Sequence, residues 1–93
     1  MDKSSSAKVY VKVAATFEES GRMLPRTLYW EDGRPYQIDR VIDVRQASAQ
    51  KAGGHGDRYT VSISGKQRYL FFERSGSLSG NNLGRWFVER KLA

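Results

Sequence analysis

Cysteine is absent from this 93-residue sequence, which excludes disulfide bonds and the thiolate ligands of zinc and iron–sulfur sites. No apolar run approaches the roughly 20 residues that a membrane-spanning helix needs. The first residues, Met1 to Ser6, also lack the apolar core of a signal peptide. We therefore expect a cytoplasmic protein without a metal site, a cofactor or an association with membranes.

The sequence has little of what catalysis requires. His55 is the single histidine, and it lies among glycines, where no rigid neighbour orients it as a base or a ligand. Asp39 and Asp43 lie on one face of a predicted strand, about 13 Å apart at ~3.3 Å per residue, which is too far to share one metal ion. The glycine-rich stretch 51–58 lacks the Walker pattern of nucleotide hydrolases and is best interpreted as a connection. The sequence thus predicts a protein that binds rather than an enzyme.

Positive charge is what the chain has in excess. Sixteen Lys and Arg face ten Asp and Glu, a formal net charge of +6, and arginines outnumber lysines. A basic surface is the electrostatic signature of nucleic-acid binders, and the planar guanidinium suits phosphate and base contacts. Charge of this size also serves solubility alone. The balance favours a polyanionic partner.

The length supports one domain with one layered core. Residues 1–6 are polar and serine-rich, which predicts a disordered tail, and residues 7–93 form the single domain. In residues 7–17, Val9 and Val11 alternate with Lys8, Tyr10 and Lys12, as in a strand buried on one face. Further strands are expected at 24–30, 34–45, 57–64, 66–74 and 85–90.

Turn residues and phase shifts divide these strands. Asp32-Gly33 predicts a two-residue type I′ turn, because that turn needs positive φ. Within 34–45, Ile42 shares the face of Ile38, and a bulge or bend near Arg40 accounts for the change of phase.

Gly65 closes a hairpin between 57–64 and 66–74, with either Ser64-Gly65 or Gly65-Lys66 in the turn. In both registers Tyr69 and Phe71 share one face with Thr60, which would form an exposed apolar patch if nothing covers it.

Short strands at close spacing predict an all-β fold: a small antiparallel barrel or strongly bent sheet of five or six strands, SH3-like or OB-like. At most one short helical turn is expected, at 46–52, because that stretch tolerates helix and ends in glycines.

Three motifs stand out along residues 24–90. Trp30 opens a Trp-x-x-Gly-Arg-x-Tyr hairpin, Arg58-Tyr59 lies in a central strand, and Gly84-Arg85-Trp86 opens the last strand. Together they resemble a small bacterial domain of unknown function that occurs near, or fused to, polymerase-like proteins of the Y-family translesion repair type. The resemblance implies an association with DNA repair and no particular chemical activity.

Two binding functions follow as hypotheses. The first is a module that binds the phosphate backbone of DNA or RNA through basic residues, with one or two aromatic rings that stack on bases. The second is an adaptor that docks on a polymerase-like protein through an aromatic surface or an open sheet edge. Trp30, Tyr36 and Trp86 are expected mainly in the core, because a small domain needs its large rings there. The candidate nucleic-acid-binding residues are Arg34, Arg40, Arg45, Lys51, Arg58, Lys66, Arg68, Tyr69, Phe71 and Arg85.

Overall fold

Seven β-strands make up the elements of the computed structural model, which describes residues 6–47, 56–75 and 81–91. The strands are β1 (Ser6–Phe17), β2 (Met23–Tyr29), β3 (Pro35–Gln37), β4 (Arg40–Ala47), β5 (Gly56–Ile63), β6 (Lys66–Arg74) and β7 (Gly84–Lys91). The predicted all-β class is confirmed. Within these ranges no helix is long and apolar enough to cross a bilayer.

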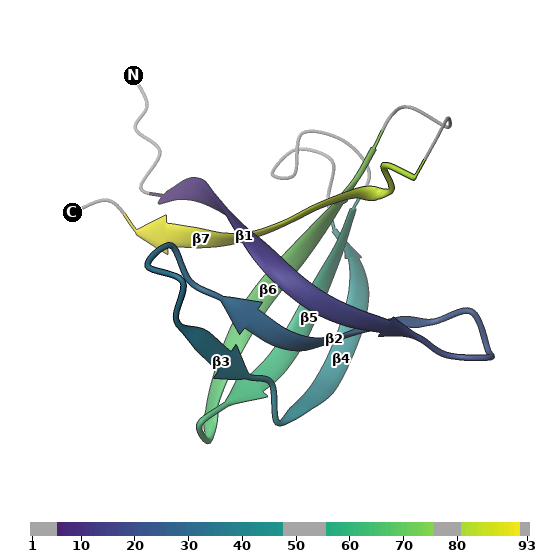
Figure 1. Ribbon diagram of the computed structural model, residues 1–93, viewed down its shortest axis with the longest axis horizontal. Helices are drawn as coiled ribbons and strands as arrows, with labels where there is room; N and C mark the ends of the chain where they lie inside the picture. The colour runs from purple at the N-terminus through teal and green to yellow at the C-terminus, as the bar shows by residue number, and fades with distance from the viewer. Residues whose placement is uncertain (1–5, 48–55, 76–80, 92–93) are drawn as a thin grey trace.

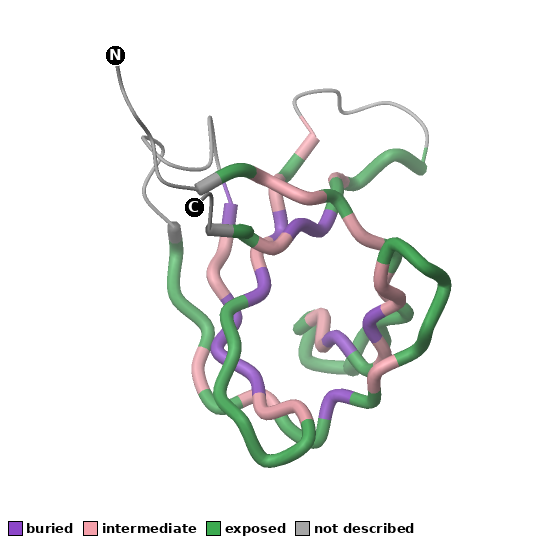
Figure 2. Tube along the Cα trace, turned by 90° about the vertical axis from the view of Figure 1, so that its left-hand side faces the viewer, coloured by how far each residue is buried: buried purple, intermediate pink, exposed green. Residues whose placement is uncertain are grey.

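The strands form one antiparallel sheet in the order β3-β2-β1-β7-β6-β5-β4 (Figure 1). β1 pairs with β7 along its first half and with β2 along its second half, so it links the two parts of the sheet. The sheet curls strongly, as Figure 2 shows along the chain trace, which gives the barrel-like form expected from the sequence. The count exceeds the expected five or six strands because the segment 34–45 is split in two.

That split is a two-residue corner at Ile38 and Asp39, between β3 and β4. The Ile38 amide donates to the Arg26 carbonyl of β2 at 2.9 Å, and the Asp39 amide donates to the Ser62 carbonyl of β5 at 2.7 Å. One corner therefore bonds to strands from opposite ends of the sheet order. The predicted bend near Arg40 is confirmed, and it fixes the curl.

The core fills the concave side of the sheet. Alternate residues of each strand face it, because successive side chains of a strand point to opposite faces. The hydroxyl of Tyr59 donates to the Met23 carbonyl at 2.8 Å and so ties β5 to the start of β2. Burial raises the pKa of this phenol, with the carboxylate of Asp57 as the next cause. The buried residues of the core are Leu28, Ile38, Tyr59, Val61, Leu70, Phe72 and Trp86.

Three local expectations are corrected. Ile42 was expected on the core face, but the bulge in β4 lies at this residue, so Val41 packs on the core and Ile42 is 46% exposed. The turn after β2 is a longer loop in which the Gly33 amide donates to the Trp30 carbonyl, and Gly33 alone has positive φ there. Ala47 ends β4 as a strand residue, so no helical turn begins at 46–47, and residues 48–52 lie outside the described ranges.

Gly84, at the start of β7, lies where the backbones of β6 and β7 approach closely. Its φ is +152°, and a Cβ there would lie 2.3 Å from the Glu73 carbonyl oxygen. We expect Gly84→Ala to destabilise the fold by roughly 3 kcal/mol, because both strain and overlap oppose it. Gly33→Ala is the control: its φ is +85° and no atom lies within 4 Å, so only strain of about 1 kcal/mol applies. Urea unfolding measures both, and equal losses would contradict the close approach.

Candidate nucleic-acid interface

The convex side of the sheet carries a row of side chains that crosses four strands. Cross-strand pairing places Arg58 of β5 opposite Phe71 of β6, Phe71 opposite Phe87 of β7, and Phe87 opposite Tyr10 of β1. All four point away from the core, because their neighbours along each strand face it. We call this surface, with its flanking residues, the outer face.

Aromatic rings form the floor of the outer face. Phe71 and Phe87 are stacked, with ring centroids 4.9 Å apart and planes 6° apart, and Tyr10 meets Phe87 edge-on at 5.8 Å. Phe87 is only 1% exposed although it does not belong to the core cluster. Its neighbours on the outer face therefore bury it, and they form a second, smaller apolar cluster.

Cations cover the rings of this face. The guanidinium of Arg85 lies 3.9 Å from the ring centroid of Tyr10, and that of Arg58 lies 4.6 Å from the ring centroid of Tyr69. Both tyrosines remain accessible, at 39% exposed for Tyr10 and 48% for Tyr69. Cation–π attraction orients both guanidiniums against the sheet. Each end of the row thus carries an arginine placed on an exposed ring.

Lysines occupy the β1 part of the same face. The ammonium of Lys12 lies 5.1 Å from the ring centroid of Tyr29, and that of Lys8 lies 4.9 Å from the ring centroid of Phe87. These two residues point to the same side of β1 as Tyr10, so the expected polar face of this strand is part of the outer face. Basic side chains therefore extend from β5 to β1.

Glu73 balances part of this charge. Its carboxylate accepts a hydrogen bond from the Tyr10 hydroxyl at 2.8 Å and contacts the Lys8 ammonium at 3.5 Å. The hydrogen bond from Tyr10 is the main cause that lowers the pKa of Glu73, and the positive charge of Lys8 acts in the same direction, against partial burial. The carboxylate is therefore charged at neutral pH and fixes the position of Tyr10.

The cations of the outer face differ in their partners. Arg45 of β4 pairs with Asp43 at 2.8 Å. Among the described residues, no carboxylate lies within ion-pair distance of Lys12, Arg58 or Arg85. The buried Nε of Arg58 also has no hydrogen-bond acceptor within the described part of the chain. An unpartnered buried donor is rare and costs free energy.

The structure brings together some of the predicted residues and separates others. Arg45, Arg58, Tyr69, Phe71 and Arg85 share the outer face.

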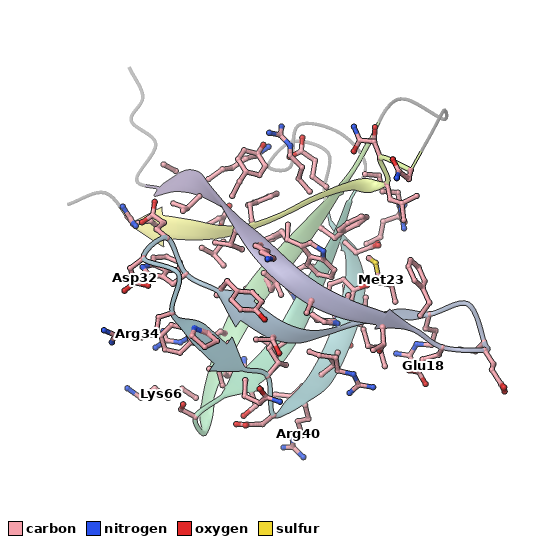
Figure 3. The ribbon with its side chains drawn as sticks, in the orientation of Figure 1. Glu18, Met23, Asp32, Arg34, Arg40 and Lys66 are labelled. Carbon is pink, nitrogen blue, oxygen red and sulfur yellow. The ribbon has the colours of Figure 1, made fainter. Side chains whose placement is uncertain are left out.

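The rest of the predicted set lies elsewhere. Lys66 and Arg68 lie at the start of β6, and Arg34 lies in the β2–β3 turn, 3.9 Å from Asp32. Figure 3 shows Arg34, Arg40 and Lys66 extending from the lower side of the sheet, away from its centre. Lys51 falls outside the described residues.

Tyr10, Lys12, Tyr29 and Phe87 complete the outer face but were not among the predicted site residues. The alternation of Lys8, Tyr10 and Lys12 was visible in the sequence. The neighbouring strand was not visible: β7 lies between β1 and β6 in the sheet, and the Tyr10 hydroxyl bonds across it to Glu73, 63 positions away. No local pattern reports contacts at that separation.

A groove opens beside the outer face, on the concave side. It has a volume of about 680 Å³ and lies between the first half of β6, the end of β7 and the β2–β3 hairpin. Trp30 and Tyr36, which were expected mainly in the core, are half-buried: they pack against the core and also line the wall of the groove. Trp86 is buried in the core as expected. Across the described ranges, no three His, Asp or Glu side chains gather as metal ligands.

Tyr10→Phe tests the hydrogen bond from the Tyr10 hydroxyl to the Glu73 carboxylate. Removing the hydroxyl donor should raise the pKa of Glu73 and destabilise the protein by about 1 kcal/mol at pH 7. Because the folded-state pKa is lowered, Glu73 contributes stability above its unfolded pKa, and that contribution disappears as pH falls through the folded pKa. The difference between variant and parent should therefore shrink towards pH 3.

Carbon-detected NMR titration of Glu73 and urea unfolding at pH 7 and pH 3 measure both effects. Tyr69→Phe is the control, because the Tyr69 hydroxyl makes no hydrogen bond within the described ranges. A Glu73 pKa that is the same in Tyr10→Phe and in the parent would contradict the assignment.

Comparison with known proteins adds no assignment: no family model, no curated protein and no solved structure matches this chain.

Proposed function

We propose that this protein is a non-catalytic nucleic-acid-binding module that contacts single-stranded DNA or RNA through its outer face. The observation that carries the proposal is the pair Arg58–Tyr69 and Arg85–Tyr10. Each is a guanidinium with no carboxylate within ion-pair distance in the described chain, held against an exposed ring. Single-strand-binding surfaces combine the same two elements, cations for phosphates and flat groups for bases.

The geometry of the row supports stacking rather than groove insertion. A base stacks on an arginine plane as well as on an aromatic ring, so an arginine that covers a tyrosine keeps a flat surface available. Arg58 and Tyr10 lie on strands three spacings apart, about 14 Å at ~4.8 Å per strand. Sheet platforms of this kind accommodate about two or three bases.

The charge of the face supports contact with phosphates. Arg45 and Lys8 form ion pairs with Asp43 and Glu73, and Glu73 also attracts its cross-strand neighbour Arg85 beyond ion-pair distance, whereas Lys12 and Arg58 have no such partner among the described residues. An unneutralised cation releases counterions from the nucleic acid when it binds a phosphate. The resemblance of residues 24–90 to a domain associated with repair polymerases makes DNA the first nucleic acid to test.

Fluorescence anisotropy with a labelled single-stranded DNA, a duplex and an RNA of equal length, at 50 and 200 mM salt, tests the proposal. We expect micromolar binding to single strands that weakens steeply with salt. Arg58→Gln combined with Arg85→Gln should weaken binding at least tenfold and reduce the salt slope by about 1 to 2, as for the loss of two phosphate contacts.

Arg26→Gln combined with Arg34→Gln is the matched control. It removes the same charge, but Arg26 pairs with Glu18 and Arg34 pairs with Asp32, both away from the outer face. This control should keep most of the affinity. Equal losses in the two double variants would mean that only net charge matters, and a lack of binding at 50 mM salt would refute the function.

A further inference from the structure

Among the described residues, the first half of β6 has a strand on one side only. β6 pairs with β5 from Lys66 to Glu73, but it pairs with β7 only from Phe71 to Arg74. Beyond Phe87, β7 continues to Lys91 in pairing with β1. The two neighbouring strands therefore diverge, and each leaves an unpaired edge that faces the other.

The β5–β6 register identifies the backbone groups on the β6 edge. Ser64 and Gly65 both have positive φ and form a two-residue turn, so Ile63 and Lys66 close the hairpin as a hydrogen-bonded pair. Because such pairs alternate along a strand, Gln67 and Tyr69 direct their N–H and C=O groups to the other side. No strand lies there, and no other backbone partner for these groups occurs in the described part of the chain.

The β7 edge offers a matching group. Phe87 pairs with Phe71, so the backbone of Glu89, two residues further, faces the same side, where β6 has moved away. Unpaired edge groups of this kind are a template for another strand. The gap therefore presents backbone donors and acceptors from both walls.

Apolar side chains lie under this gap, and cations lie at its β6 rim. The groove of about 680 Å³ is lined by Leu28, Trp30 and Tyr36 from one side and by Val61 and Val88 from the others. At the rim, Lys66 and Arg68 have no ion-pair partner among the described residues. A ligand that fits must combine an extended backbone, apolar side chains at alternate positions and negative charge next to β6.

We propose that this groove binds an extended acidic peptide from a partner protein, which adds as a strand to the open edge of β6. The edge from Lys66 to Leu70 spans about 13 Å at ~3.3 Å per residue, which fits a segment of roughly five residues. Lys66 and Arg68 point to the groove side of β6, in phase with the core residue Leu70, so the groove-facing side chains of the peptide would be a carboxylate beside Lys66 and Arg68 and apolar groups beyond them. This binding is separate from nucleic-acid binding on the outer face and does not depend on it.

Backbone pairing distinguishes a peptide from a nucleic acid at this place. Amide donors and acceptors repeat every second residue along a strand edge, and a second strand complements that repeat. A phosphate backbone would find two cations at one rim and Glu89 at the opposite wall, over an apolar floor. The outer face, with its arginines on rings, suits nucleic acid better.

The test uses a fluorescein-labelled alternating peptide of seven residues, Glu-Ser-Glu-Ser-Val-Ser-Val, titrated into the full chain; its groove-facing positions carry glutamates for Lys66 and Arg68 and valines for the apolar floor. We expect binding in the micromolar range, and NMR exchange of the Gln67, Tyr69 and Glu89 amides slowed at least tenfold. A peptide of the same composition, with its valines grouped at one end, should bind at least tenfold more weakly. The same alternating peptide with an N-methyl group on every amide should not bind, because neither of its edges can then donate backbone hydrogen bonds to β6.

Two variants place the site. Lys66→Glu combined with Arg68→Glu should weaken binding at least tenfold, whereas Arg58→Gln combined with Arg85→Gln on the outer face should leave it unchanged. Gln67→Pro should also weaken it, because it removes a donor of the open edge without touching the pairing with β5.

Three outcomes would overturn the proposal: no binding of the alternating peptide, equal binding of the N-methylated peptide, or slowed exchange at residues of the outer face instead of β6. Displacement of the peptide by single-stranded DNA, with DNA binding lost in the Lys66→Glu and Arg68→Glu variant, would assign the groove to nucleic acid instead. Failure of the outer-face experiment would leave the peptide result standing.

Discussion

The short connection between β3 and β4 is the constraint on which the rest of the structure depends. These strands are the two edges of a seven-stranded sheet, which would lie about 29 Å apart if the sheet were flat, at ~4.8 Å per strand. Gln37 and Arg40 are three residues apart along the chain, so they are separated by at most about 11 Å. The sheet must therefore curl, and the bonds of Ile38 to Arg26 and of Asp39 to Ser62 fix the curl at that corner.

Curling gives a small domain one enclosed face and one large convex face. The concave side buries the core, whereas the convex side receives no second layer from the described chain. Phe87 is covered instead by Phe71, by Tyr10 and by the side chain of Lys8. The long stems of basic residues thus shield rings while their charges stay in water. The same arrangement that stabilises this face makes it basic.

Alternation in the sequence predicted much of this geometry. It placed Lys8, Tyr10 and Lys12 on one face of their strand, and Tyr69 and Phe71 on one face of theirs, as the structure shows. The period-two pattern predicts the facing of these side chains correctly because one face of each strand is buried against the core and the other is not.

Two features escaped sequence reasoning for physical reasons. The bulge at Ile42 shifts the alternation of β4 by one residue. Because Val41 and Ile42 are both apolar, the sequence does not show which of them faces the core. Strand order was hidden because β7 lies between β1 and β6, so the contact of Tyr10 with Glu73 joins residues 63 positions apart. The residues of the outer face were therefore recognisable singly, but their assembly needed the fold.

β6 belongs to both surfaces, and this has a geometric consequence. The side chain of Tyr69 lies on the outer face under Arg58, while its backbone lies on the open edge of the groove. A strand that paired with this edge would alternate its side chains between the two sides of the sheet. Every second side chain would therefore continue the outer face next to Tyr69, whereas the others would fill the groove. A bound peptide would thus widen the surface that we assign to nucleic acid, and an acidic side chain there would oppose phosphates, whereas a basic one would favour them.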